Sequence, residues 1–236
     1  MPLVTDSEVG QPEPPPVDPG DEDGDDGEGG TPWGQQAWQL LVLGLAVRFL
    51  GGAIGYAVTK NADEASTPKA GSVDVGFLQD MRWHHDQAVR MAFLMLDKPA
   101  AGQDERVRSV ATDILRTQQF EAGVMAGQLR AWGQDEANTS GTGMAWMGMP
   151  IPIDRMPGMA SEAEIDQLKA ATGRDADLLF LRLMTAHHQG GLHMAIDAEA
   201  KADSQLAREL AGAIIKSQEF EIGELTNLTN ALNTAA

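Results

Sequence analysis

The sequence contains no cysteine, few aromatic residues and little positive charge. Without cysteine the chain cannot form disulfides, Cys-ligated zinc or iron–sulfur sites, a catalytic thiol or a lipoprotein anchor on an N-terminal Cys. With 17 basic against 35 acidic residues it also lacks the charge that neutralises nucleic-acid phosphates, so we expect no nucleic-acid partner. Only 5% of the residues are aromatic, while Ala, Leu and Met are common, which favours helices over a β-sandwich.

The first 32 residues form an acidic segment. They contain ten Asp and Glu residues, no Lys or Arg, and many Pro and Gly. A segment of this composition cannot bury enough apolar surface to offset the entropy lost on ordering. We therefore expect residues 1–32 to be a disordered tail.

A mostly apolar stretch occupies residues 33–58, with Trp33, Trp38 and Tyr56 where interfacial aromatic residues are expected. About 20 helical residues, at roughly 1.5 Å each, span a bilayer core. We expect an uncleaved transmembrane anchor; a buried soluble helix and a cleaved signal peptide are the alternatives. Arg48 would cost about 3 kcal/mol inside the bilayer unless it reaches the interface or pairs with a membrane-protein partner.

The rest of the chain contains an internal repeat. Residues 77–92 match residues 180–195 at an offset of 103, and both copies carry Met-x-x-His-His. Residues 114–123 match residues 214–223 at an offset of 100, and both carry Gln-x-Phe-Glu. Two antiparallel helix pairs bury their apolar stripes best against each other. The repeat therefore predicts an all-α fold, a four-helix bundle made of two tandem helix pairs.

The borders of this bundle follow from local signals. Residues 59–72 read as a polar linker, which leaves 73–236 for the bundle. Between the two repeats, Ser161 and Glu164 have the spacing of a capping box, which predicts a short helix ending near Gly173.

The His and Met residues of each repeat share one helix face. At 100° per residue they fall on the inward stripe, whereas His193 falls on the polar face. A hydrogen-bonded core histidine and a packing methionine are the alternative interpretation, which the exact duplication makes less favourable. The candidate ligands are Met81, His84, His85, Met91, Met184, His187, His188 and Met194.

Polar residues also lie on the apolar face of the second helix in each repeat. They are Gln118 and Glu121 in the first copy and Gln218 and Glu221 in the second. A buried carboxylate without a partner costs several kcal/mol, and the nearest candidates are the imidazoles of the partner helix. We expect Glu121 and Glu221 to orient the His rings.

Thioether and imidazole together indicate copper. Carboxylate-rich di-iron bundles need Glu-x-x-His pairs, which neither Glu121 nor Glu221 begins. Zinc would use His and Glu but leave the methionines without a role. A soft, neutral set of sulfur and nitrogen ligands suits Cu(I) and needs no thiol.

Five more methionines lie between the repeats, in a stretch rich in Gly and Pro. They could form a flexible thioether site that captures or hands over Cu(I), or an apolar loop that covers the bundle. These candidates are Met144, Met147, Met149, Met156 and Met159.

The two Met-x-x-His-His stretches, together with Met156-Pro157-Gly158-Met159, resemble the family called domain of unknown function 305, or CopM-like, within the ferritin-like superfamily. The resemblance covers about residues 72–234. It implies a ferritin-like bundle on the extracytoplasmic side, copper as the bound metal and the eight His and Met residues as its ligands. The first copy has Asp86-Gln87-Ala88 where the second has Gln189-Gly190-Gly191, so we expect the two half-sites to differ in affinity.

These inferences predict a membrane-anchored, extracytoplasmic copper-binding protein that sequesters or delivers copper and is not an enzyme. One alternative is a ferritin-like oxidoreductase that uses two metal ions. Another is a structural or assembly subunit of a membrane complex.

Overall fold

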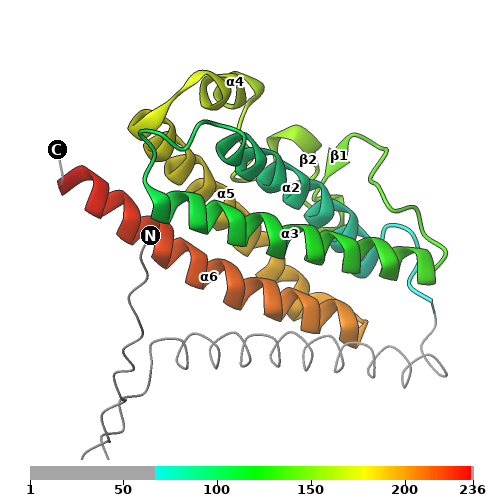
Figure 1. Cartoon of the computed structure of the whole chain (residues 1–236). Helices are drawn as coiled ribbons and strands as arrows, with labels where there is room; N and C mark the ends of the chain where they lie inside the picture. The colour runs from blue at the N-terminus through cyan, green and yellow to red at the C-terminus, as the bar shows by residue number, and fades with distance from the viewer. Residues whose placement is uncertain (1–66, 235–236) are drawn as a thin grey trace, which may run out of the picture. The chain divides into compact units, whose positions relative to one another are not determined.

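The computed structural model describes residues 67–234, which are mostly helical (Figure 1). The predicted tail (1–32), the predicted span (33–58) and most of the linker lie outside the described residues. Within the described residues, no helix is both long and apolar enough to cross a membrane. The prediction of an all-α fold is confirmed for this part. The helices are α2 (Val73–Leu96), α3 (Glu105–Ala131), α4 (Glu162–Ala170), α5 (Gly173–Lys201) and α6 (Gln205–Thr234).

Side-chain caps fix where several helices begin. The Ser72 hydroxyl accepts the N–H of Val75 at the start of α2, at 3.3 Å. Asp104 caps α3 in the same way, accepting the N–H of Arg106 at 2.8 Å. The capping box predicted for the short helix is present at the start of α4, with Ser161 as its N-cap. Each cap satisfies backbone donors that have no partner inside the helix.

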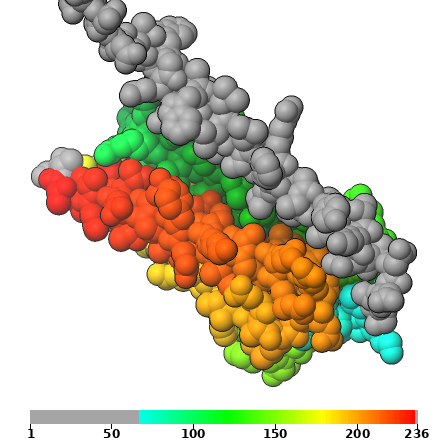
Figure 2. Space-filling model, turned by 90° about the horizontal axis from the view of Figure 1, so that it is seen from below, coloured from blue at the N-terminus to red at the C-terminus, as the bar shows by residue number. Residues whose placement is uncertain are grey.

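The four long helices form two antiparallel pairs, α2 with α3 and α5 with α6 (Figure 1). The pairs meet chiefly through α2 and α5, which pack against each other. Helices α3 and α6 contact each other less and lie along the same face, where α6 is orange to red and α3 is green (Figure 2). The first helix of each repeat is therefore the inner one, which places both Met-x-x-His-His stretches in the interior.

The connection between the two pairs contains the only strands in residues 67–234. Strand β1 (Thr142–Gly143) pairs antiparallel with β2 (Ile151–Pro152), and single turns of 3-10 helix, η1 (Ala145–Met147) and η2 (Ile153–Arg155), complete it. The helical periodicity of the sequence did not predict this ladder, because two-residue strands leave no alternating pattern to detect.

Asp80 holds this connection against α2. Its carboxylate accepts the N–H of Met144 at 2.6 Å, the indole N–H of Trp146 at 2.9 Å and the amide of Asn138 at 2.7 Å. Burial raises the pKa of Asp80 above its usual value, although the hydrogen bonds from these three donors lower it in part. A fully buried carboxylate is tolerated here because its oxygens are hydrogen-bonded.

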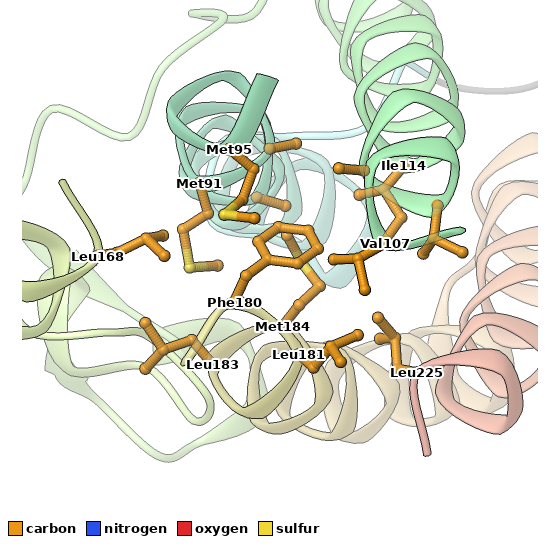
Figure 3. Packing of buried hydrophobic residues seen from close by; sticks show 14 of the residues in the cluster. Met91, Met95, Val107, Ile114, Leu168, Phe180, Leu181, Leu183, Met184 and Leu225 are labelled. Atoms are coloured by element: carbon orange, nitrogen blue, oxygen red, sulfur yellow. The ribbon is translucent and has the colours of Figure 1, made fainter. Parts of the chain in front are cut away.

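Buried apolar side chains form two clusters. In the first, Met91, Met95 and Met184 surround the ring of Phe180 (Figure 3). The second contains Met81 and Met194. On α2 the His pair lies between Met81 and Met91, and on α5 it lies between Met184 and Met194. The four histidines therefore form a polar layer between two apolar clusters.

Candidate metal centre

Four histidines meet where α2 and α5 pack together. His84, His85, His187 and His188 each have 0% of their surface exposed. The rings of His84 and His187 have centroids 3.7 Å apart, and those of His187 and His188 are 6.1 Å apart. His193, which the helical wheel placed on the polar face, is exposed. The inward orientation expected for the two His pairs is thus present.

Two of the rings donate to carboxylates from the outer helices. His85 Nε2 lies 2.7 Å from Glu121 Oε2, and His188 Nε2 lies 2.6 Å from Glu221 Oε2. Both glutamate side chains are 10% exposed, so each reaches from the edge of the bundle to a fully buried ring. An ionised carboxylate only accepts, which places the hydrogen of each ring on Nε2. The repeat predicted this contact in both copies.

The other two rings donate to backbone carbonyls. His187 Nε2 lies 3.0 Å from the carbonyl oxygen of His84. His84 Nε2 lies 3.1 Å from the carbonyl oxygen of Pro157, in the connection between the helix pairs. A carbonyl can only accept, so Nε2 carries the hydrogen in these rings as well. In all four rings Nε2 is therefore the hydrogen-bonded nitrogen, and Nδ1 is the nitrogen left without a hydrogen-bond partner.

The Pro157 carbonyl reaches His84 because two glycines remove side chains from its path. A Cβ on Gly190 would lie 1.9 Å from the oxygen of Pro157. Gly158 has φ +81°, and a Cβ there would lie 2.5 Å from the carbonyl oxygen of Ala186. Glycine suits such positions because it tolerates positive φ and the close approach of another backbone. The Gly190 of the second repeat, where the first has Gln87, thus creates the asymmetry between the two halves.

The Nδ1 atoms of all four rings are buried and have no hydrogen-bond partner within the described residues. Burial lowers the pKa of His84 to about 3 and lowers that of His187 well below its usual value. These two imidazoles are therefore neutral at physiological pH, with an unshared electron pair on Nδ1. A histidine that donates one N–H to a carboxylate or carbonyl and presents its other nitrogen is the usual form of a metal ligand.

The four predicted thioether ligands are all buried, but they do not meet at one point. Met81 and Met194 belong to one apolar cluster, and Met91 and Met184 to the other. Among residues 67–234, no group of three or more His, Asp or Glu side chains is arranged to hold a metal ion.

The five methionines of the connection are dispersed. Met144 and Met156 are buried in the second apolar cluster, and Met147 and Met159 are partly buried against it. Met149 is 52% exposed. The backbone carbonyl of Pro157, in the same connection, is hydrogen-bonded to His84 in the His layer.

Two further buried polar side chains come from the outer helices. Gln118 and Gln218 are 0% exposed, and both polar atoms of each amide lack a hydrogen-bond partner among the described residues. The sequence placed them on the apolar face, and their duplication was the available signal. The acceptor role of the Pro157 carbonyl was not predicted, because residue identity does not reveal a backbone acceptor; the only sequence trace of its close approach is the pair of glycines, Gly158 and Gly190.

Comparisons with known proteins agree on a family. The model of the family described as "Domain of unknown function (DUF305)" matches residues 74–229. A candidate secreted DUF305 protein from Streptomyces coelicolor is 38% identical with a TM-score of 0.64, covering 70% of this chain and 96% of that one. A DUF305 fragment from Deinococcus radiodurans is 32% identical with a TM-score of 0.59, covering 70% and 99%.

A more distant solved structure is CopM in its Cu(I)-bound form, which is 25% identical with a TM-score of 0.49 and covers 67% of this chain and 96% of that one. At that TM-score the likeness is too weak to transfer its copper to this chain. No curated protein matches the sequence.

Proposed function

The chain belongs to the DUF305 family, and we propose that it binds a soft metal ion, Cu(I), in the buried histidine layer. The observation that supports this most strongly is the common state of the four rings. Each imidazole uses Nε2 as a donor and leaves Nδ1 buried without a partner. A buried acceptor without a partner costs about 1–3 kcal/mol, so four of them in one layer favour a bound cation.

Copper(I) fits the chemistry of this layer better than a hard cation. The His84 and His187 rings are neutral because burial lowers their pKa values, and the methionines that flank the layer on both sides are soft, polarisable ligands. The two carboxylates that are hydrogen-bonded to the rings, those of Glu121 and Glu221, come from the outer helices. The residues that would hold the metal are His84, His85, His187 and His188 with Met81, Met91, Met184 and Met194.

A role in sequestration or delivery follows from burial. A site enclosed by helices shields bound Cu(I) from bulk solvent, which suits storage or transfer of the ion. We also propose that the protein acts outside the cytoplasm, held by the apolar segment at 33–58. The absence of cysteine is compatible with an oxidising compartment, where thioethers remain usable. The classification of the bundle as ferritin-like likewise stays a prediction.

An anaerobic titration tests this proposal. Purified protein competes with a chromogenic Cu(I) chelator, and the copper retained is measured directly. We expect wild type to retain copper, and a His84→Ala, His187→Ala double variant to lose most of the affinity. The control is His193→Ala, which changes an exposed ring. Failure of wild type to bind at micromolar free copper, or equal binding by the double variant, would contradict the proposal.

The two rival functions predict different observations. An oxidoreductase would consume peroxide or oxygen when loaded with metal. A structural or assembly subunit would co-purify with a membrane complex in mild detergent and retain that association after the four histidines are replaced.

A further inference from the structure

The buried amides of Gln118 and Gln218 lack hydrogen-bond partners, and a metal ion bound by His and Met would not supply them. Each amide offers two donor hydrogens and an acceptor oxygen, and none of these is paired within the described residues. A buried polar group without a partner costs about 1–3 kcal/mol, so both residues carry an unfavourable energy in both repeats. Leucine would fit the same apolar face without this cost.

The Gln218 side chain occupies space that Gly191 leaves free. A Cβ on Gly191 would lie 2.6 Å from its Oε1 and 3.1 Å from its Nε2, so the glycine makes room for the amide. Gly191 lies one turn after His188 on α5. On α6, Gln218 lies one turn before Glu221, which accepts the hydrogen of His188. The amide is therefore held at the level of the histidine layer.

The amide donors cannot be satisfied by a cation. An N–H needs an acceptor, and a metal ion offers none. The amide oxygen is a hard ligand that Cu(I) does not favour, and using it would leave the donors unpaired. The unshared pairs of the imidazoles are acceptors, but none of the four Nδ1 atoms is hydrogen-bonded to an amide. What both amides require is a small molecule or ion with lone pairs.

We infer that Gln118 and Gln218 hydrogen-bond a small inorganic ligand of the bound metal, such as water, hydroxide or a small anion. The inference rests on the proposed function, because it needs a metal in the histidine layer. It assigns the two glutamines a positioning role: they hold the non-protein ligand and do not bind the metal. The bound metal would then have one ligand that the protein does not supply.

Azide is a suitable probe, since it binds open positions on Cu(II) and produces a charge-transfer absorption band. The protein is first loaded with Cu(I), the retained copper is measured, and the metal is then oxidised in place. Azide is titrated by absorbance and by electron paramagnetic resonance. We compare wild type with the Gln118→Leu, Gln218→Leu double variant. Gln119→Leu is the control, because it makes the same change at an exposed position beside Gln118.

The expected result is saturable azide binding in wild type and in the control. In the double variant we expect copper to be retained and azide to bind at least about 10-fold more weakly, because the ligand loses its hydrogen bonds. Equal azide affinity in the double variant, no azide response in wild type, or loss of copper on oxidation would each overturn the inference. A wild type that never retains Cu(I) contradicts the proposed function itself and is seen at the first step.

Discussion

Gly190 is the position where a single added methyl group should disturb the histidine layer most. In Gly190→Ala the new Cβ would lie 1.9 Å from the carbonyl oxygen of Pro157 and 2.2 Å from its carbon. Real Cβ contacts are not shorter than about 3.0 Å, so the Pro157 segment must retreat by about 1.1 Å. Both groups are backbone, and no change of rotamer relieves the clash.

The energetic cost has two parts. Forcing extra volume into a close-packed contact costs about 1–3 kcal/mol. Moving the Pro157 carbonyl away also breaks its 3.1 Å hydrogen bond with His84 Nε2, which leaves a buried donor unpaired at a further cost of about 1–3 kcal/mol. A central total of about 4 kcal/mol lowers the Tm by roughly 8–16 °C for a chain of this size.

Thermal unfolding of the metal-free protein measures this effect. The matched control is Gly123→Ala, an exposed helix position where nothing lies within 4 Å of the added Cβ. That change should raise stability by about 0.4–1 kcal/mol, because alanine restricts the unfolded chain. If Gly190→Ala melts at or above the temperature of wild type, the proposed contact between the loop and α5 is wrong.

Three further predictions follow from the same layer. Glu221→Gln keeps a hydrogen-bond acceptor for His188 but removes the negative charge of the carboxylate. This variant should bind Cu(I) about 10–100-fold more weakly in the competition titration. The control Glu105→Gln changes an exposed carboxylate and should leave the affinity unchanged. For the metal-free protein, the unfolded state binds a proton at His84 below pH 6.5 and the folded state binds it only near pH 3. As the pH falls from 6.5 toward 3, the free energy of unfolding should therefore decrease by up to about 1.4 kcal/mol per pH unit because of His84. The urea midpoint measures this decrease, and an unchanged midpoint between pH 6.5 and 4.5 would contradict the prediction. Asp80→Asn should lower the free energy of unfolding by about 1–3 kcal/mol. It should also increase the mobility of Trp146, whose indole N–H donates to Asp80, and so lower the fluorescence anisotropy. An unchanged anisotropy would argue against Asp80 as the residue that holds the connection.

The pairing of His with Glu could be predicted from the sequence because it depends on helix faces. The wheel places His85 and Glu121 on inward stripes, and the connection at residues 97–104 makes α2 and α3 antiparallel neighbours. The same reasoning applied to the second repeat predicts the contact of His188 with Glu221. Both contacts need only the angle of each residue around its helix.

The arrangement of the methionines could not be predicted in this way, since it depends on distance along the helix axis. The two inner helices run antiparallel and cross at His84 and His187, whose rings are 3.7 Å apart. That crossing brings Met81 toward Met194 and separates both from Met184. A helical wheel gives the direction of a side chain but not its height. In the sequence the eight candidate ligands looked like one centre, whereas in the fold the four histidines form a layer and the four methionines belong to the clusters on either side of it.

The connection between the helix pairs was predictable in composition but not in structure. Its methionines suggested a flexible site, yet Met144 adopts φ 58°, and its N–H is held by Asp80. Such long-range contacts decide which thioethers are buried. The sequence alone could not show that Asp80, on the helix of the first repeat, would hold the loop.

The proposal that the Nδ1 atoms bind the metal is tested most directly by observing the imidazole nitrogens. Nitrogen-15 NMR of histidine-labelled protein reports Nδ1 and Nε2 of each ring separately, before and after one addition of Cu(I) or its diamagnetic analogue Ag(I). We predict that the rings of the layer start with hydrogen on Nε2, and that the metal shifts their Nδ1 resonances while His193 is unaffected. Shifts at Nε2, or no change in any ring of the layer at saturating metal, would contradict the claim that the unpaired Nδ1 atoms bind the ion.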